Sequence, residues 1–299
     1  DRLLRVEIVR DPGGRYGLEG YTAIINIILR NDYKGTEIFI QEQPILDLDP
    51  ANIEDAILIN EAYLSYNYTY NKLNLYCTAR SSYNNFTISI SSQTTYKDSM
   101  TVSELPVTDS PNSLINSYNQ DYTLGFDYTF KPGQIISFES SLKALPLATE
   151  NNSFQNTADI LVADTLVKTY NYKTTTASKT LNSYNTLFYV GKFKNDNELS
   201  VNFTYNNYTQ DYNTSSFQSS FYDRIEEGTN KKQYTRFNVE WTHPFSNKFT
   251  TQVGYGNTWR KLDNKFSIAQ INLEDNSSFA ASNSFKLTDF RNKAYAYFS

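Results

Sequence analysis

Apolar and polar side chains alternate with a period of two along several stretches of the chain. In residues 122–130, Tyr, Leu or Phe occupies every even position, and Thr, Gly or Asp occupies the odd positions between them. A similar alternation recurs in residues 62–70, 199–206 and 236–241. Successive side chains of a β-strand point to opposite sides, whereas a helix repeats about every 3.6 residues. The pattern therefore predicts strands with one apolar and one mostly polar face.

The connections between these strands alternate in predicted length. The short ones lie at residues 70–72, 131–134, 194–198 and 245–248. Long polar stretches, which predict loops, lie at residues 87–117, 144–181, 211–230 and 261–287. A soluble sandwich has no reason to keep every second connection short, whereas a transmembrane barrel has short periplasmic turns and long extracellular loops. The connections therefore favour an all-β fold, an antiparallel transmembrane β-barrel.

About ten strands are expected, starting near residues 36, 60, 73, 118, 135, 184, 198, 232, 249 and 288. Many carry Tyr, Phe or Trp at an end of the apolar set, as at Tyr70, Phe130 and Trp259. Such rings suit the boundary between lipid and water, where the ring is buried and its polar atom stays wet. Cross-strand aromatic pairing in a soluble sheet is the alternative. The alternating connections favour the lipid boundary.

The composition fits a barrel that exposes only alternate residues to lipid. The 299 residues include 25 Tyr and 19 Phe, yet the mean hydropathy is −0.56. No apolar run reaches the roughly 18 residues that a transmembrane helix needs. The net charge is −5 and no basic run offers a footprint for phosphates, so nucleic acid is not an expected partner. The single cysteine, Cys77, excludes an internal disulfide framework.

The first 30 residues carry a different pattern. Apolar β-branched residues lie on both sides of Pro12, Gly13 and Gly14, which cannot continue a strand. This predicts a hairpin that pairs residues 6–9 with residues 24–28. Residues 23–29 are apolar except for Asn26, which suits a strand buried on both faces. Taken alone, such a hairpin could belong to any α+β domain.

The segment resembles the end of the plug domain in TonB-dependent outer-membrane receptors, and is most similar to the Bacteroidota-type branch of that family. The likeness covers a first strand, a Gly- and Pro-rich turn, a Tyr-containing stretch that ends in Gly, and a second strand. The residues that carry it are Glu7, Arg10, Pro12, Arg15, Tyr16, Glu19, Gly20 and Asn26. Gly13 and Gly14 depart from the small Ser-Ala pair that this branch usually has here.

The resemblance implies that residues 1–35 are the C-terminal part of a plug and that residues 36–299 begin a barrel. Barrels of about eight strands fill with side chains, whereas a plug needs about 22 strands around it. The chain is therefore expected to be part of a longer receptor, truncated at both ends, in the bacterial outer membrane. The resemblance also implies import of a scarce solute, such as an iron chelate, oligosaccharide, peptide or cofactor. The energy would come from the TonB inner-membrane complex, which would contact a periplasmic segment, the TonB box, expected before Asp1.

Charged residues inside such a barrel need partners, because an unpaired charge with little water around it is costly. The candidates are Arg10, Arg15 and Glu19 in the plug and, facing the lumen, Asp127, Glu139, Arg236 and Glu240. Solvation of the same charges in a wet lumen is the alternative.

Other chemistry finds little support, so neither an enzyme nor a cofactor is expected. His243 is the only histidine and stands beside Pro244 without a recognisable nucleophile, which predicts a structural role. Asp47 and Asp49 match the first two positions of a calcium loop, but Ala51 occupies the third, so no metal site is expected. A non-transporting outer-membrane adhesin, whose loops bind protein or glycan, is the main alternative function. A soluble secreted β-protein is a weaker one.

Overall fold

The computed structural model describes residues 3–10, 23–29, 34–47, 57–88, 90–95, 100–106, 113–143, 149–246 and 249–298. These residues form two antiparallel sheets. One joins β1 (Leu3–Arg10) to β2 (Ala23–Leu29), and the other has 13 strands. Among the described residues, no helix is long and apolar enough to cross a membrane.

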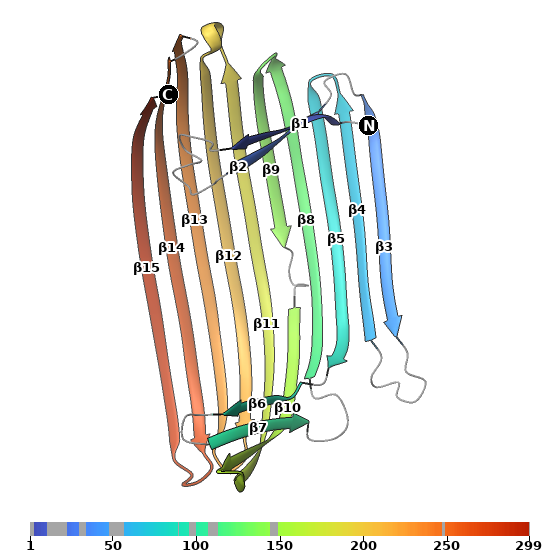
Figure 1. The fold of residues 1–299 in the computed structure, drawn as a ribbon, viewed down its shortest axis with the longest axis vertical. Helices are drawn as coiled ribbons and strands as arrows, with labels where there is room; N and C mark the ends of the chain where they lie inside the picture. The colour runs from blue at the N-terminus through green and yellow to red at the C-terminus, as the bar shows by residue number, and fades with distance from the viewer. Residues whose placement is uncertain are drawn as a thin grey trace.

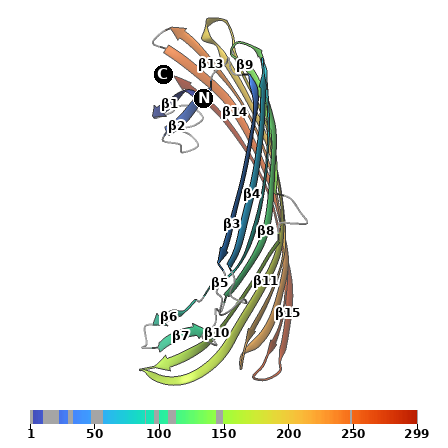
Figure 2. The same cartoon turned by 90° about the vertical axis from the view of Figure 1, so that its right-hand side faces the viewer.

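The large sheet is a curved wall in which strands follow one another in chain order (Figures 1 and 2). Eleven of its 13 strands make up the wall: β3 (Gly35–Asp47), β4 (Ile57–Tyr70), β5 (Leu73–Ile88), β8 (Ser113–Lys131), β9 (Gln134–Lys143), β10 (Thr149–Val162), β11 (Thr165–Lys192), β12 (Glu198–Gln218), β13 (Tyr222–Ser246), β14 (Phe249–Asn272) and β15 (Ser278–Phe298). Both β9 and β10 pair with β8 and β11, so they share one position. Each predicted strand has a counterpart in this wall, which β3 and β15 border.

Two short strands leave the wall. β6 (Ser92–Thr95) pairs with β7 (Met100–Pro106), and β7 pairs in turn with β10. Both lie in the stretch 87–117 that was predicted to be a loop. They cross the wall at the end opposite β1 and β2 (Figure 1).

The connections predicted to be short lie together at one end of the wall, which we name the short-turn end (Figure 1). Residues 71–72 join β4 to β5, and residues 132–133 join β8 to β9. A short 3₁₀ helix, η2 (Lys194–Asp196), joins β11 to β12, and β14 begins three residues after β13 ends. Gly133 has a φ of 78°, a conformation that glycine adopts without strain. The short turns are confirmed.

The prediction of long loops at the other end, the hairpin end, was wrong for most of residues 144–181, 211–230 and 261–287. β11 has 28 residues, β13 has 25 and β14 has 24, so strands run through much of these stretches. The turns are brief. Ala163 and Asp164 form the tip of β10 and β11 with φ values of 49° and 62°, as a type I′ turn requires.

Strand pairing continues at the hairpin end because the polar side chains there tolerate a strand. Thr and Tyr favour β-structure, and a ladder satisfies every backbone group it includes. Side chains also tie the tips of neighbouring hairpins. Lys168 Nζ lies 3.3 Å from Glu274 Oε1, and the rings of Tyr170 and Phe221 meet edge to face at 5.3 Å. A polar stretch of sequence is therefore not sufficient to predict a loop in this chain.

The register places the predicted apolar sets on one face of the wall. Phe203 lies opposite Leu187 on β11 and Phe237 on β13, and Phe126 lies opposite Phe138 on β9. The polar sets share the other face, which lines the inside of the curve that Figure 2 shows.

The two faces are inverted relative to a soluble protein. On the convex face, Leu124 is 60% exposed and Phe203 is 41% exposed. On the concave face, the polar residues Ser200 and Thr204 are only 7% exposed. Soluble proteins bury their large apolar side chains. This inversion is expected of a wall whose outer solvent is lipid.

The β1–β2 hairpin lies on the concave side of the wall, toward the short-turn end (Figures 1 and 2). Val6 pairs with Ile27 and Ile8 with Ile25, so the predicted pairing of residues 6–9 with residues 24–28 is confirmed. β4 pairs instead with β3 and β5, so the hairpin is separate from the wall. Its identity as a plug stays a prediction.

Candidate functional site on the concave face

The four charges predicted to face a lumen lie on the concave face. Asp127, Glu139, Arg236 and Glu240 all belong to the polar set that the register defines. Asp127 accepts a hydrogen bond from Asn74 Nδ2 at 3.0 Å, so its carboxylate has a partner within the wall. Whether these four meet charges of a plug stays a prediction.

The plug-like residues are described only in part. Glu7 lies opposite Asn26 in the β1–β2 ladder, and Arg10 lies opposite Ala23. The remaining predicted positions lie outside the described residues: Pro12, Arg15, Tyr16, Glu19 and Gly20.

Glu139 is held by a row of three residues across neighbouring strands. Tyr76 on β5 lies opposite Gly125 on β8, and Gly125 lies opposite Glu139 on β9. The Tyr76 ring crosses over the glycine, and its hydroxyl donates to Glu139 Oε2 at 2.9 Å. A Cβ on Gly125 would lie 2.2 Å from Tyr76 Cζ, so only glycine leaves room for the ring. We name this arrangement a Tyr–Gly–Glu row.

Glu240 is held by a second Tyr–Gly–Glu row, at the other side of the wall. Tyr295 on β15 lies opposite Gly254, which lies opposite Glu240 on β13. The Tyr295 hydroxyl donates to Glu240 Oε2, and a Cβ on Gly254 would lie 2.2 Å from Tyr295 Cζ. Rings laid over strand glycines replace the packing that the missing side chain would give. Both carboxylates are thereby fixed on the concave face.

A related contact lies beyond the apolar band, toward the hairpin end. The Tyr212 ring covers Gly228, and its hydroxyl donates to Glu226 Oε1 at 3.3 Å. Burial and the nearby Glu226 carboxylate raise the pKa of Tyr212 above its ordinary value. The phenol therefore stays protonated and remains a donor well into the alkaline range.

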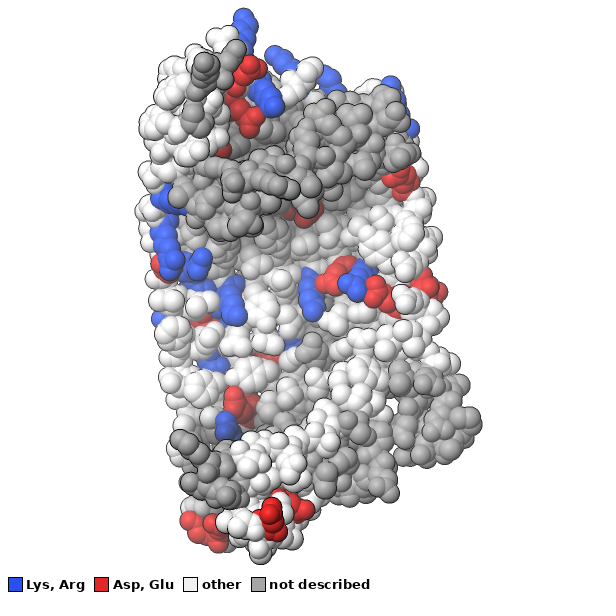
Figure 3. All heavy atoms as spheres, viewed as in Figure 1, with Lys and Arg blue, Asp and Glu red and all other residues white. Residues whose placement is uncertain are grey.

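Cations gather on the concave face of β13–β15, as Figure 3 shows for that face. We name this group, defined by register, the concave cationic cluster: Lys232, Arg236, Arg260, Arg291 and Lys293. Arg236, Thr258 and Arg291 form one row across three strands. Lys232 Nζ lies 5.2 Å from the ring centre of Tyr208, and Arg260 lies 5.7 Å from that of Tyr234. Both distances suit cation–π contacts.

The other half of the concave face has no excess of positive charge, since acids there outnumber bases among the described residues. Arg80 Nη2 lies 2.8 Å from Glu61 Oε2. Asp121 stands between Arg80 and Lys143 in one register row, so acid and base alternate across β5, β8 and β9. On β13–β15, in contrast, Asp289 and Glu240 are the acids near the five cations, and Asp289 pairs with Arg291 at 2.8 Å. The excess of positive charge is therefore local to β13–β15.

Sequence reasoning identified Arg236 but missed the other four members of the cluster. Their signal was present in the alternation, because Lys232 and Arg260 fall in the polar sets of predicted strands. The register that brings β13, β14 and β15 together was needed to align them. No sequence pattern marked the Tyr–Gly–Glu rows, since the tyrosine and the glutamate of a row are 63 or 55 positions apart along the chain.

Comparison with known families agrees with this geometry. Residues 191–299 match the model of an outer membrane protein beta-barrel family. The fold is therefore that of an outer-membrane β-barrel, and the chain lies in the bacterial outer membrane. Its convex apolar face therefore meets the lipid of the bacterial outer membrane, and its concave face lines the barrel interior. No curated protein and no solved structure matches the chain.

The barrel shows no metal centre in the part of the chain that the structure describes. No group of three or more His, Cys, Asp or Glu side chains there could hold an ion. His243 has a local role, as its Nδ1 contacts Asn197 Oδ1 near η2 and its ring packs on Phe245. These contacts support the structural role predicted for it.

Proposed function

We propose that this barrel is part of a TonB-dependent receptor that binds a scarce solute and imports it across the outer membrane. One observation carries the proposal. A hairpin whose sequence resembles the end of a plug stands on the concave side of a barrel wall and pairs only within itself among the described strands. A plug in that place blocks the lumen until energy from the TonB complex rearranges it.

The orientation follows from the two ends of the wall. Outer-membrane barrels have short turns on the periplasmic side, so the short-turn end is assigned to the periplasm and the hairpin end to the outside. The β1–β2 hairpin is then near the periplasm, where the TonB complex acts. The solute is an iron chelate, oligosaccharide, peptide or cofactor that the hairpin end receives.

The charges on the concave face suit a plug. Glu139 and Glu240 are held in place by the Tyr–Gly–Glu rows and offer acceptors to Arg10 and Arg15. The concave cationic cluster offers partners to Glu19 or to an anionic solute. Fixed partners lower the cost of keeping a charge in a confined lumen.

The test is binding of the complete protein to the purified periplasmic domain of TonB from the same organism, measured by biolayer interferometry. The proposal expects saturable binding that a peptide covering the segment before Asp1 inhibits. Absence of binding by a folded, heat-modifiable barrel would overturn it.

A non-transporting adhesin is the second candidate, and the long hairpins favour it. β11–β15 continue beyond the apolar band, and contacts such as that of Lys168 with Glu274 join their tips into one rim. A rim of this kind can bind protein or glycan. Retained binding of cells to a host surface together with absent TonB binding would favour the adhesin. We infer for both candidates that the barrel is not an enzyme.

A further inference from the structure

A second group of cations lies on the convex face, where the apolar band ends. We name it the outer lysine belt and define it by register as Lys179, Lys231, Lys261, Lys265 and Lys286. All five side chains are exposed. They lie on β11, β13, β14 and β15, on the face of the sheet opposite to the concave cationic cluster.

An aromatic row marks the border between the apolar band and the belt. Tyr205, Thr235, Trp259 and Phe290 form one register row across β12–β15 on the convex face. The next row toward the hairpin end contains Lys261, and the row after it contains Lys231 and Lys286. Two residues of a strand span about 7 Å, so the belt begins about 7 Å and ends about 20 Å beyond the aromatic rings along the strand. Tyr and Trp mark the level of lipid headgroups, which places the lysines at and just above them.

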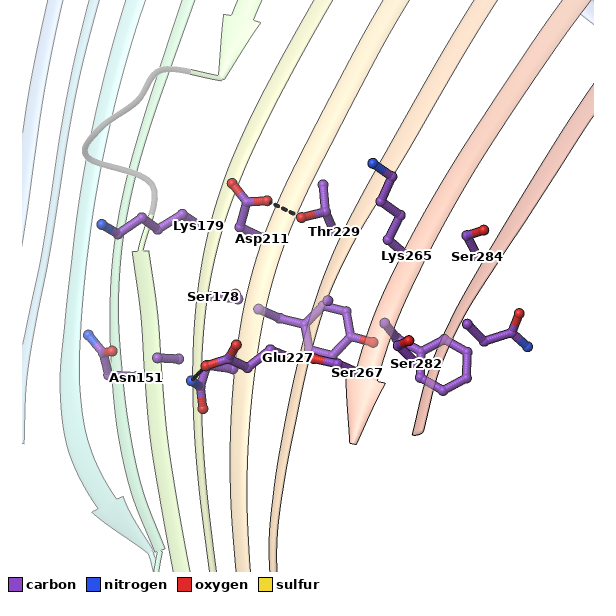
Figure 4. A pocket seen from close by; sticks show the side chains of 16 residues that line it. Asn151, Ser178, Lys179, Asp211, Glu227, Thr229, Lys265, Ser267, Ser282 and Ser284 are labelled. Carbon is purple, nitrogen blue, oxygen red and sulfur yellow. Dashed lines mark hydrogen bonds between the residues drawn. The ribbon is translucent and has the colours of Figure 1, made fainter. Parts of the chain in front are cut away.

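The last row of the belt borders a hollow in the convex face (Figure 4). This row contains Lys179, Asp211, Thr229, Lys265 and Ser284. The hollow has a volume of about 1030 Å³, and hydroxyls and amides line much of it. Ser267 and Ser282 lie across it from the lysines, as Figure 4 shows. Hydroxyl and amide groups hydrogen-bond sugars, and lysines bind phosphates.

The acids nearby do not cancel the belt. Asp263 pairs with Lys286 at 3.7 Å. Asp211 accepts a hydrogen bond from Thr229 Oγ1 at 2.7 Å, and Glu227 accepts one from Asn213 Nδ2 at 2.9 Å. The belt has five lysines and these three acids nearby, so this part of the convex face has a net positive charge.

The belt is local, because no described residue on the convex face of the other half of the wall is a cation at the corresponding level, and the charged residue there, Glu42 on β3, is an acid. Ser81 and Tyr83 on β5 and Gln120 and Tyr118 on β8 occupy its convex positions. The cations are therefore a feature of β11–β15 and not of the entire boundary.

We propose that the outer lysine belt and its hollow bind the phosphorylated sugar headgroup of a glycolipid in the outer leaflet. The belt lies next to the lipid-facing aromatic row, so a membrane lipid reaches it with its chains along the apolar band. Lysines at this level attract anionic headgroups with energies that add up over several residues. A soluble anion has no chains to place there, and the position of the belt therefore favours a lipid.

The test uses the complete protein in detergent micelles, with a phosphorylated diglucosamine lipid and its phosphate-free counterpart as probes. Binding is measured by native mass spectrometry at several lipid concentrations. The proposal expects the phosphorylated lipid to bind at least about tenfold more tightly than its counterpart. The triple variant Lys261→Gln/Lys265→Gln/Lys286→Gln should remove most of that preference.

A matched control changes cations of the same strands on the other face: Lys232→Gln/Arg260→Gln/Lys293→Gln. It should retain the preference within about twofold. Equal losses in the two triple variants, or an unchanged preference in the belt variant, would overturn the proposal. Full displacement of the lipid by millimolar inorganic phosphate would also overturn it, since it would point to a site for a free anion.

Discussion

At the residue scale, glycines determine where rings can cross the wall. Gly125 and Gly254 lie under Tyr76 and Tyr295, and each ring reaches a glutamate two strands away. A strand glycine usually weakens a sheet, because it leaves no side chain to pack. Here the tyrosine fills that space and fixes a carboxylate on the concave face.

Gly254→Ala should therefore destabilise the barrel by about 1–3 kcal/mol, because the new methyl group displaces the Tyr295 ring. Gly256→Ala is the matched control two residues along the same face, where the nearest atom is the flexible tip of Asn238. Gly256→Ala should lower the free energy of unfolding by less than Gly254→Ala does. Urea unfolding of the refolded protein in detergent, followed by tryptophan fluorescence, measures both, and equal costs would count against the role of the row.

The facing of single residues can be tested in the same way. Phe203→Arg should cost about 2–4 kcal/mol, since it places a charge in lipid, whereas Asn202→Arg should be nearly neutral in the lumen. Unfolding in lipid vesicles separates the two. Similar costs at both positions would mean that the convex face does not meet lipid.

At the scale of elements, the alternation of side chains predicted the wall strands well. Strands such as β4, β5, β9 and β12 begin within three residues of the predicted starts. The period of two is visible in the sequence because one face of the wall meets lipid and the other meets water. Lipid favours apolar side chains and water favours polar ones. At the hairpin end water surrounds both faces, so the sequence there does not alternate between apolar and polar side chains. The strands at that end could therefore not be distinguished from loops. The tip at Ala163 and Asp164 also lacks the Asn-Gly signal of a tight turn.

The hairpins make a topological prediction. An epitope tag inserted at the tip between Ala163 and Asp164, or at Asn276 between β14 and β15, should bind antibody on intact cells that express the complete protein. A tag at Gly133, in the β8–β9 turn, should bind only after permeabilisation. Surface binding at Gly133 would reverse the assigned orientation.

At the scale of the whole molecule, two cationic groups on opposite faces of β11–β15 serve different surroundings. The concave cationic cluster faces the lumen, where the proposed plug or an anionic solute would supply acids. The outer lysine belt faces the headgroup region. The register alone could reveal this division, because neighbouring residues such as Lys231 and Lys232 point to opposite sides.

The central claim is that the segment containing β1 and β2 closes the lumen of an outer-membrane barrel. Conductance across a planar lipid bilayer tests it most directly, with the complete protein compared with a variant that lacks residues 1–30. Migration of the folded and heated forms on a gel confirms that both barrels are folded. The account predicts a silent complete protein and large stepwise currents from the deletion variant. Equal conductance of the two proteins would contradict it.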